Sequence, residues 1–146
     1  MSRINGEIMK RHLKEFEKLV DIMEKLRKGC IWDKEQTHES LVKYLISEAD
    51  ELKRAVKNND MENLEEELGD VLLQVVFHSQ IAKENKNFSV ADVINTLNKK
   101  LIRRHPHVFG KYKVKTAKDV EIMWKEVKAK EKAAKTASVS RKRIKK

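Results

Sequence analysis

Apolar residues recur every three or four positions along most of the chain, a spacing that places them on one face of an α-helix. The first run covers residues 7–28 and ends at Gly29. Four more runs cover residues 38–58, 61–84, 89–103 and 116–132. One proline and four glycines in 146 residues exclude a loop-rich or many-turned β chain. We therefore predict an all-α bundle of about five helices.

The net charge of +10 is concentrated at the carboxyl end of the chain. Residues 132–146 contain seven Lys or Arg and no acid, whereas residues 1–131 contain 26 basic and 23 acidic side chains. We predict a helical domain over residues 1–131 and a basic, disordered tail over residues 132–146. The nearly balanced domain does not indicate a nucleic-acid groove. The tail is either a weak nucleic-acid anchor or a solubilising extension, and we favour the second.

Apolar runs in this sequence are short, and cysteine is almost absent. No apolar run exceeds three residues, which excludes a membrane span or a secretory signal core. Cys30 is the lone cysteine, so an internal disulfide is impossible, as is typical of proteins from a reducing compartment. We expect a cytoplasmic protein with no membrane partner.

Carboxylates interrupt the apolar stripes of the second and third predicted helices. Glu48 falls within one stripe and Glu51 follows three residues later; Glu67 and Asp70 repeat this arrangement on the next helix. Residues three apart are neighbours on a helix surface. A short turn centred near residue 59 makes the two helices antiparallel neighbours. The two pairs therefore lie at matched heights.

Four converging carboxylates repel one another in a partly dry site and need a cation or bound protons. Oxygen-only donors suit Mg²⁺, or Mn²⁺ in its place, and Mg²⁺ commonly binds substrate phosphates as well. A single pair of this kind is usually solvated and paired with Lys. Two pairs at matched heights on apolar edges favour a metal site.

Several segments resemble the MazG-type all-α nucleotide pyrophosphohydrolases, in the same order along the chain. The acidic signature of that family is matched by SEADE (47–51) and EELGD (66–70). Further matches are WDKEQTHESL (32–41), ELGDVLLQVVFHSQIA (67–82), KKLIRRHPHVFG (99–110) and the final W-x-x-x-K. The resemblance extends from about residue 13 to residue 132.

This resemblance implies helical hairpins that associate into homodimers or larger homo-oligomers, and Mg²⁺-dependent cleavage of nucleoside triphosphates between the α and β phosphates. The products are a nucleoside monophosphate and pyrophosphate, and the usual role is the removal of non-canonical nucleotides. By motif position, the metal-binding and catalytic residues are Glu48, Glu51, Glu67 and Asp70. Ser47 replaces the first Glu of the family motif, which we expect to alter water positioning rather than abolish activity.

Two further pairs of residues lie four apart on predicted helices: Lys100 with Arg104, and Trp124 with Lys128. Cations on one helix face neutralise triphosphate charge, and Arg offers a two-pronged donor. The resemblance implies nucleotide contact for all four residues. The apolar stripe around Trp124 instead favours a core position, and both interpretations stay open.

Other residues carry weaker signals. Asp33 and Lys34 are weak candidates for substrate contact, because charged loop residues are commonly just solvated. His105 and His107 either stiffen the loop around Pro106 or meet phosphate.

The sequence predicts structural roles for His78 and Cys30, and it does not decide which carboxylate would act as the catalytic base. We expect His78 to be a packed, hydrogen-bonded core residue. Cys30 has no evident base that would make it a nucleophile. Either Glu48 or Glu51 would activate the attacking water.

Two alternatives remain. One is a relative within the same superfamily that is dedicated to a single nucleotide, such as phosphoribosyl-ATP or dUTP. The other is a non-catalytic helical interaction protein whose basic tail binds nucleic acid or another acidic partner. A scaffold gains nothing from carboxylates on buried helix edges, so their placement discriminates between the classes.

Overall fold

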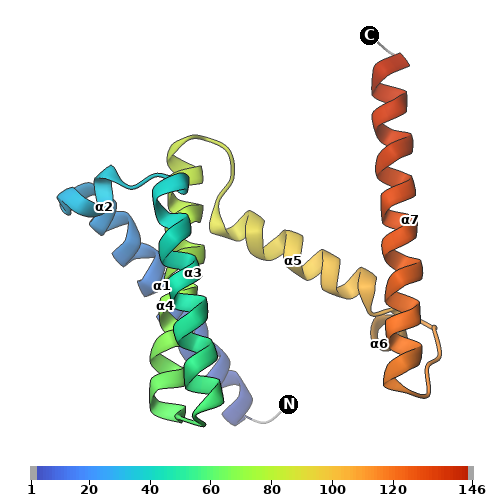
Figure 1. Ribbon diagram of the computed structural model, residues 1–146, viewed down its shortest axis with the longest axis horizontal. Coiled ribbons are helices and arrows are strands. Elements are labelled where there is room, and N and C mark those ends of the chain that lie inside the picture. Colours follow the sequence, from blue (N-terminus) through green and yellow to red (C-terminus); the bar gives the residue numbers. More distant parts are fainter. Residues whose placement is uncertain (1–2, 145–146) are drawn as a thin grey trace. The chain divides into compact units, whose positions relative to one another are not determined.

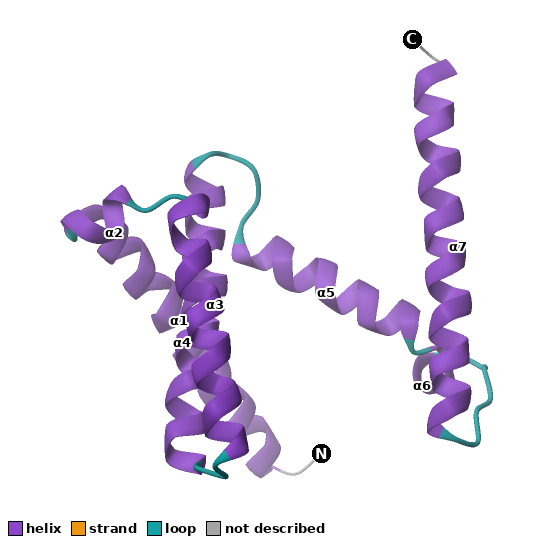
Figure 2. Cartoon of the chain, in the orientation of Figure 1, coloured by secondary structure: helices purple, strands orange, loops and turns teal. Residues whose placement is uncertain are grey.

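The computed structural model describes residues 3–144, and every regular element in that range is a helix (Figures 1 and 2). The predicted all-α class is confirmed. The helices are α1 (Arg3–Gly29), α2 (Ile31–Glu35), α3 (His38–Lys57), α4 (Met61–Glu84), α5 (Val90–Arg104), α6 (Pro106–Phe109) and α7 (Ala117–Ile144). Five of them match the predicted helices, and the short α2 and α6 lie in segments predicted as loops.

Side-chain caps define the hairpin of α3 and α4. Thr37 and Ser40 cap α3 reciprocally, because each side chain accepts a hydrogen bond from the other residue's backbone N–H. Asp60 caps α4 by accepting from the N–H of Asn63 at 3.2 Å. Between the helices, Asn59 has a φ of 51°, a left-handed conformation that Asn tolerates better than most residues. The turn therefore joins two antiparallel helices with few residues.

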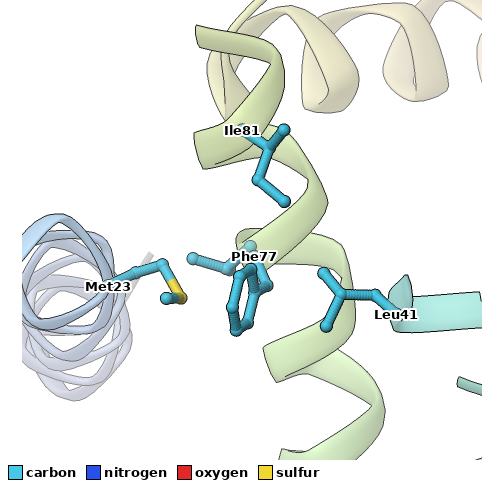
Figure 3. Close-up of a cluster of buried hydrophobic side chains, with 5 residues drawn as sticks. Met23, Leu41, Phe77 and Ile81 are labelled. Carbon is cyan, nitrogen blue, oxygen red and sulfur yellow. The ribbon is translucent and has the colours of Figure 1, made fainter. Parts of the chain in front are cut away.

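A cluster of buried apolar side chains holds α1, α3 and α4 together. Figure 3 shows Met23 of α1 and Leu41 of α3 on opposite sides of Phe77 of α4, with Ile81 one turn further along. Val76 completes the cluster, and α3 makes its main packing contacts with α4. This packing fixes the two helices that carry the four acidic residues.

Arg27 of α1 holds the short helix α2 in place. Its guanidinium donates to the backbone carbonyls of Asp33, Lys34 and Gln36, and it also pairs with Glu84 at 2.8 Å. Because α2 has only five residues, it depends on such contacts rather than on its own helix propensity. One side chain thus ties the predicted WDKEQTH loop to the end of α4.

The contacts within the chain define two compact units, residues 1–93 and 94–146. The apolar cluster belongs to the first unit. Within residues 3–144, no helix combines the length and apolar character needed to cross a membrane.

The structure differs from the prediction of a disordered tail. The last helix, α7, continues through residues 132–144, while residues 145 and 146 lie outside the described part. Alanine and lysine dominate the first half of this segment, and both are strong helix formers. Three basic residues in the last turn also interact favourably with the negative end of the helix dipole. Fading apolar periodicity therefore marks the loss of a packing face, not the end of the helix.

Candidate functional site

Three of the four predicted acidic side chains converge on one spot. Glu48 of α3 and Glu67 and Asp70 of α4 each contribute an oxygen atom that lies within 4.8 Å of the other two. The convergence follows from the antiparallel hairpin, which brings positions on either side of the turn to the same height. The structure thus forms a compact carboxylate cluster.

Burial leaves this cluster short of partners. Glu67 is only 7% exposed. Among the described residues, nothing hydrogen-bonds to its Oε2 or to Oε2 of Glu48. Burial raises the pKa of Glu67, and the charge of nearby Glu51 raises it further. Burial also raises the pKa of Glu48, followed by the charge of Asp70. The cluster therefore favours a bound cation or a bound proton.

Glu51 lies beside the cluster rather than in it. Its Oε1 is 3.8 Å from Nη2 of Arg54, one turn further along α3, and its side chain is 42% exposed. Its charge still contributes to the raised pKa of both Glu48 and Glu67. Glu51 is thus close enough to act on the cluster while remaining in contact with solvent.

The donor set fits a divalent metal ion. All candidate ligand atoms are carboxylate oxygens. Glu48 and Glu67 each also have one oxygen that is buried without a hydrogen-bond partner in the described chain. Hard cations such as Mg²⁺ and Mn²⁺ prefer such oxygens, and their charge offsets the repulsion among the carboxylates.

In the second unit, three of the four residues predicted to contact substrate line one groove of about 1240 Å³. Lys100 and Arg104 come from α5, and Lys128 comes from α7. Trp124 does not line this groove. It is half-buried, and its ring system forms a T-shaped contact with His105, with the ring centroids 5.5 Å apart. The geometry supports the packing interpretation for Trp124.

The two histidines on either side of Pro106 also make local contacts. Nδ1 of His105 lies 2.6 Å from the carbonyl oxygen of Leu101, and its ring is 5.6 Å from that of His107. Pro106 occupies the first turn of α6, where its missing N–H costs nothing. These contacts favour the interpretation that both histidines stiffen this turn.

One pair of residues was not foreseen from the sequence. His38, at the start of α3, stacks on His78 of α4 with ring planes 4° apart and Nδ1 atoms 2.8 Å apart. His78 is half-buried and hydrogen-bonded, in line with the expectation of a packed core residue. No periodicity connects residues that are 40 positions apart, so only the fold reveals this pair.

Acidic conditions are expected to weaken the fold through this pair. Burial lowers the pKa of His78, and the charge of His38 lowers it further. Below the unfolded-state pKa of about 6.5, the unfolded chain binds the proton more readily, so stability falls as the pH drops. We expect the free energy of unfolding, measured with urea between pH 7.5 and 5.5, to fall less steeply in His78→Gln. Equal slopes in variant and wild type would contradict this.

Comparisons with known proteins agree with the geometry. Residues 36–109 match the family model of the MazG nucleotide pyrophosphohydrolase domain. A protein of Thermotoga maritima, the nucleoside triphosphate pyrophosphohydrolase/pyrophosphatase MazG, is 58% identical over 127 residues, which cover 84% of this chain and 48% of that protein. The nucleoside triphosphate pyrophosphohydrolase of Escherichia coli K12 is 38% identical, with 84% and 48% covered.

A solved structure is similar as well. The crystal structure of a mazG-related protein from Thermotoga maritima superposes with a TM-score of 0.67 at 33% identity, covering 77% of this chain and 98% of that one. The chain spans about half the length of the curated relatives described above. On the family match, the sequence identity and the shared fold, this chain belongs to the MazG nucleotide pyrophosphohydrolase domain family.

Proposed function

We propose that this chain hydrolyses nucleoside triphosphates between the α and β phosphates, releasing a nucleoside monophosphate and pyrophosphate. The observation that carries the proposal is the cluster of Glu48, Glu67 and Asp70 in a chain of this family, because one oxygen of Glu48 and one of Glu67 are buried there without a hydrogen-bond partner in the described chain. The names of its relatives in Thermotoga and Escherichia describe the same class of reaction.

Glu48, Glu67 and Asp70, with Glu51 beside them, would hold Mg²⁺, or Mn²⁺ as a substitute. A metal ion held there would supply positive charge to the phosphate oxygens and make a nearby water easier to deprotonate. A carboxylate would accept a proton from the attacking water as the water oxygen bonds to phosphorus, and the bond between the α and β phosphates would break as pyrophosphate leaves. Glu48 and Glu51 are the candidates for this base, and the solvent contact of Glu51 favours it.

Lys100, Arg104 and Lys128 would neutralise the remaining charge of the triphosphate. Their shared position along one groove supports this role. Guanidinium groups bind phosphate through two parallel hydrogen bonds, whereas ammonium groups act as point charges. We assign no base contact to Trp124, because its ring packs on His105.

We also propose that the chain works as a homodimer or a larger homo-oligomer. Large apolar side chains on the hairpin are exposed in the single chain, which is unusual for a surface facing only water. They include Ile46 at 59%, Leu68 at 51%, Leu72 at 41% and Val75 at 41%. Light scattering coupled to size-exclusion chromatography measures the mass of the assembly directly.

The proposed setting is the cytoplasm, where the enzyme would remove non-canonical nucleotides. The free thiol of Cys30 suits a reducing compartment. A non-catalytic scaffold has no use for a carboxylate cluster that contains the buried Glu67. We therefore favour the enzymatic function over that of a non-catalytic scaffold.

The test is a panel of canonical, deoxy and damaged nucleoside triphosphates incubated with the full chain and Mg²⁺. We expect equal amounts of nucleoside monophosphate and pyrophosphate, none in EDTA, and a preference among bases that identifies the substrate. Asp70→Asn, purified in the same way, controls for contaminating phosphatases. Release of inorganic phosphate and nucleoside diphosphate, or no release above Asp70→Asn, would contradict the proposal.

A further inference from the structure

Glu131 of α7 binds two arginines at once, in the groove that contains Arg104. Its Oε1 accepts from Nε of Arg103 at 2.6 Å, and its Oε2 accepts from Nη2 of Arg104 at 3.1 Å. A longer contact of 3.4 Å joins Nε of Arg104 to Oε1. One carboxylate therefore bridges two guanidinium groups from α5, and all three side chains line the groove.

This bridge overcomes the natural divergence of neighbouring helical side chains. Consecutive residues in an α-helix point about 100° apart. Two adjacent guanidinium groups also repel each other. Without a common acceptor, Arg103 and Arg104 would separate in solution. Glu131 removes both obstacles, because its single negative charge attracts the two groups to one place.

The bridge leaves donor groups unused. Glu131 takes Nε of Arg103 and the Nε–Nη2 edge of Arg104. In the described part of the chain, no hydrogen bond is made by either Nη atom of Arg103 or by Nη1 of Arg104. A guanidinium held by one edge can still donate from its other nitrogens to an anion.

The surroundings match an anion that carries several charges. Five lysines line the same groove: Lys100, Lys128, Lys130, Lys132 and Lys135. The other acid in the groove, Glu126, accepts a hydrogen bond from the hydroxyl of Tyr112 at 3.2 Å rather than from an arginine. The flanking arginines lower the pKa of Glu131 to about 2, so it keeps its charge at any working pH.

We propose that Glu131 is a positioning residue that gathers Arg103 and Arg104 into one donor site for the polyphosphate chain of the substrate. The proposal rests on the function proposed above and adds Arg103 to the cationic residues of the groove. Glu131 acts only through the two arginines and touches no reacting atom.

The test separates positioning from charge. Glu131→Gln makes the groove more positive, so charge alone predicts tighter anion binding. Positioning predicts the opposite, about tenfold weaker binding, because the two guanidinium groups lose their common partner. The measurement is calorimetric titration of the full chain with inorganic tripolyphosphate in EDTA.

Glu126→Gln is the matched control, since it removes the same charge from the same groove without releasing an arginine. It is expected to bind tripolyphosphate at least as tightly as wild type. Glu131→Asp keeps the carboxylate and is expected to recover part of the lost affinity. Arg103→Ala should weaken binding in the wild type but have little further effect in Glu131→Gln.

The outcomes are distinct from those of the activity assay. Binding by Glu131→Gln as tight as that of Glu126→Gln, or no tripolyphosphate binding by wild type, would overturn the positioning role even in an active enzyme. Conversely, Glu131-dependent binding in a chain that releases no pyrophosphate would retain the anion site and reject the proposed function.

Discussion

Replacing Glu67 with Gln is expected to reduce pyrophosphate release on the order of a thousandfold while stabilising the metal-free protein. Glutamine keeps the shape of the side chain but removes a charge that the cluster needs for metal binding. The pKa of Glu67 is raised in the fold by burial and by the neighbouring carboxylates, so the fold disfavours its ionised form relative to the unfolded chain. An amide in its place carries no such penalty.

Three measurements check this result together. Steady-state kinetics report the loss of activity, and thermal unfolding in EDTA reports the gain in melting temperature. Adding Mg²⁺ should raise the melting temperature of wild type but not of Glu67→Gln. The adjacent Glu66 is exposed, so Glu66→Gln controls for the chemical change and should behave like wild type. Full activity of Glu67→Gln would refute the assignment of the metal site.

Replacing Phe77 with Ala is expected to lower the free energy of unfolding by about 3–5 kcal/mol. Phe77 is 3% exposed and lies between Met23 and Leu41 at the centre of the apolar cluster (Figure 3). Its ring also forms a T-shaped contact with Trp32, with the centroids 6.5 Å apart. The guanidinium carbon of Arg27 lies 6.0 Å from the centroid of the Phe77 ring. The deletion leaves a cavity and also loosens α2.

Urea unfolding at neutral pH, followed by circular dichroism, measures this loss. Phe88→Ala is the matched control, because the same ring is removed from a side chain that is 45% exposed. We expect the control to cost less than about 1 kcal/mol. Similar costs for the two variants would show that the cluster around Phe77 is not the centre of the core.

The hairpin of α3 and α4 could be predicted from two local features of the sequence, its apolar periodicity and its short polar turn. Periodicity identified α3 and α4, and a short polar turn made them antiparallel, which placed Glu48 against Asp70. Spacing alone also put Glu51 in the cluster. The contact of Glu51 with Arg54 depends on side-chain rotamers, which residue spacing does not determine.

The elements missed from the sequence depend on distant contacts or on propensity rather than on pattern. The helix α2 is too short to show a period and is held by Arg27, which lies in another helix. The end of α7 has no buried face, so only its alanines and lysines indicate a helix. In the sequence Glu131 has lysines on both sides, so nothing there indicates a contact with arginines. Only the fold brings it to the two arginines of α5.

The short turn at Asn59 makes the acidic hairpin sensitive to its length. Inserting one residue within either helix, between its acidic pair and the turn, would rotate that pair by about 100° and slide it by about 1.5 Å relative to the other. Evolution or design can therefore lengthen this hairpin only by extending both arms together by nearly whole helical turns. Relatives that share the chemistry should keep this interval constant, whereas loops elsewhere in the chain are free to grow.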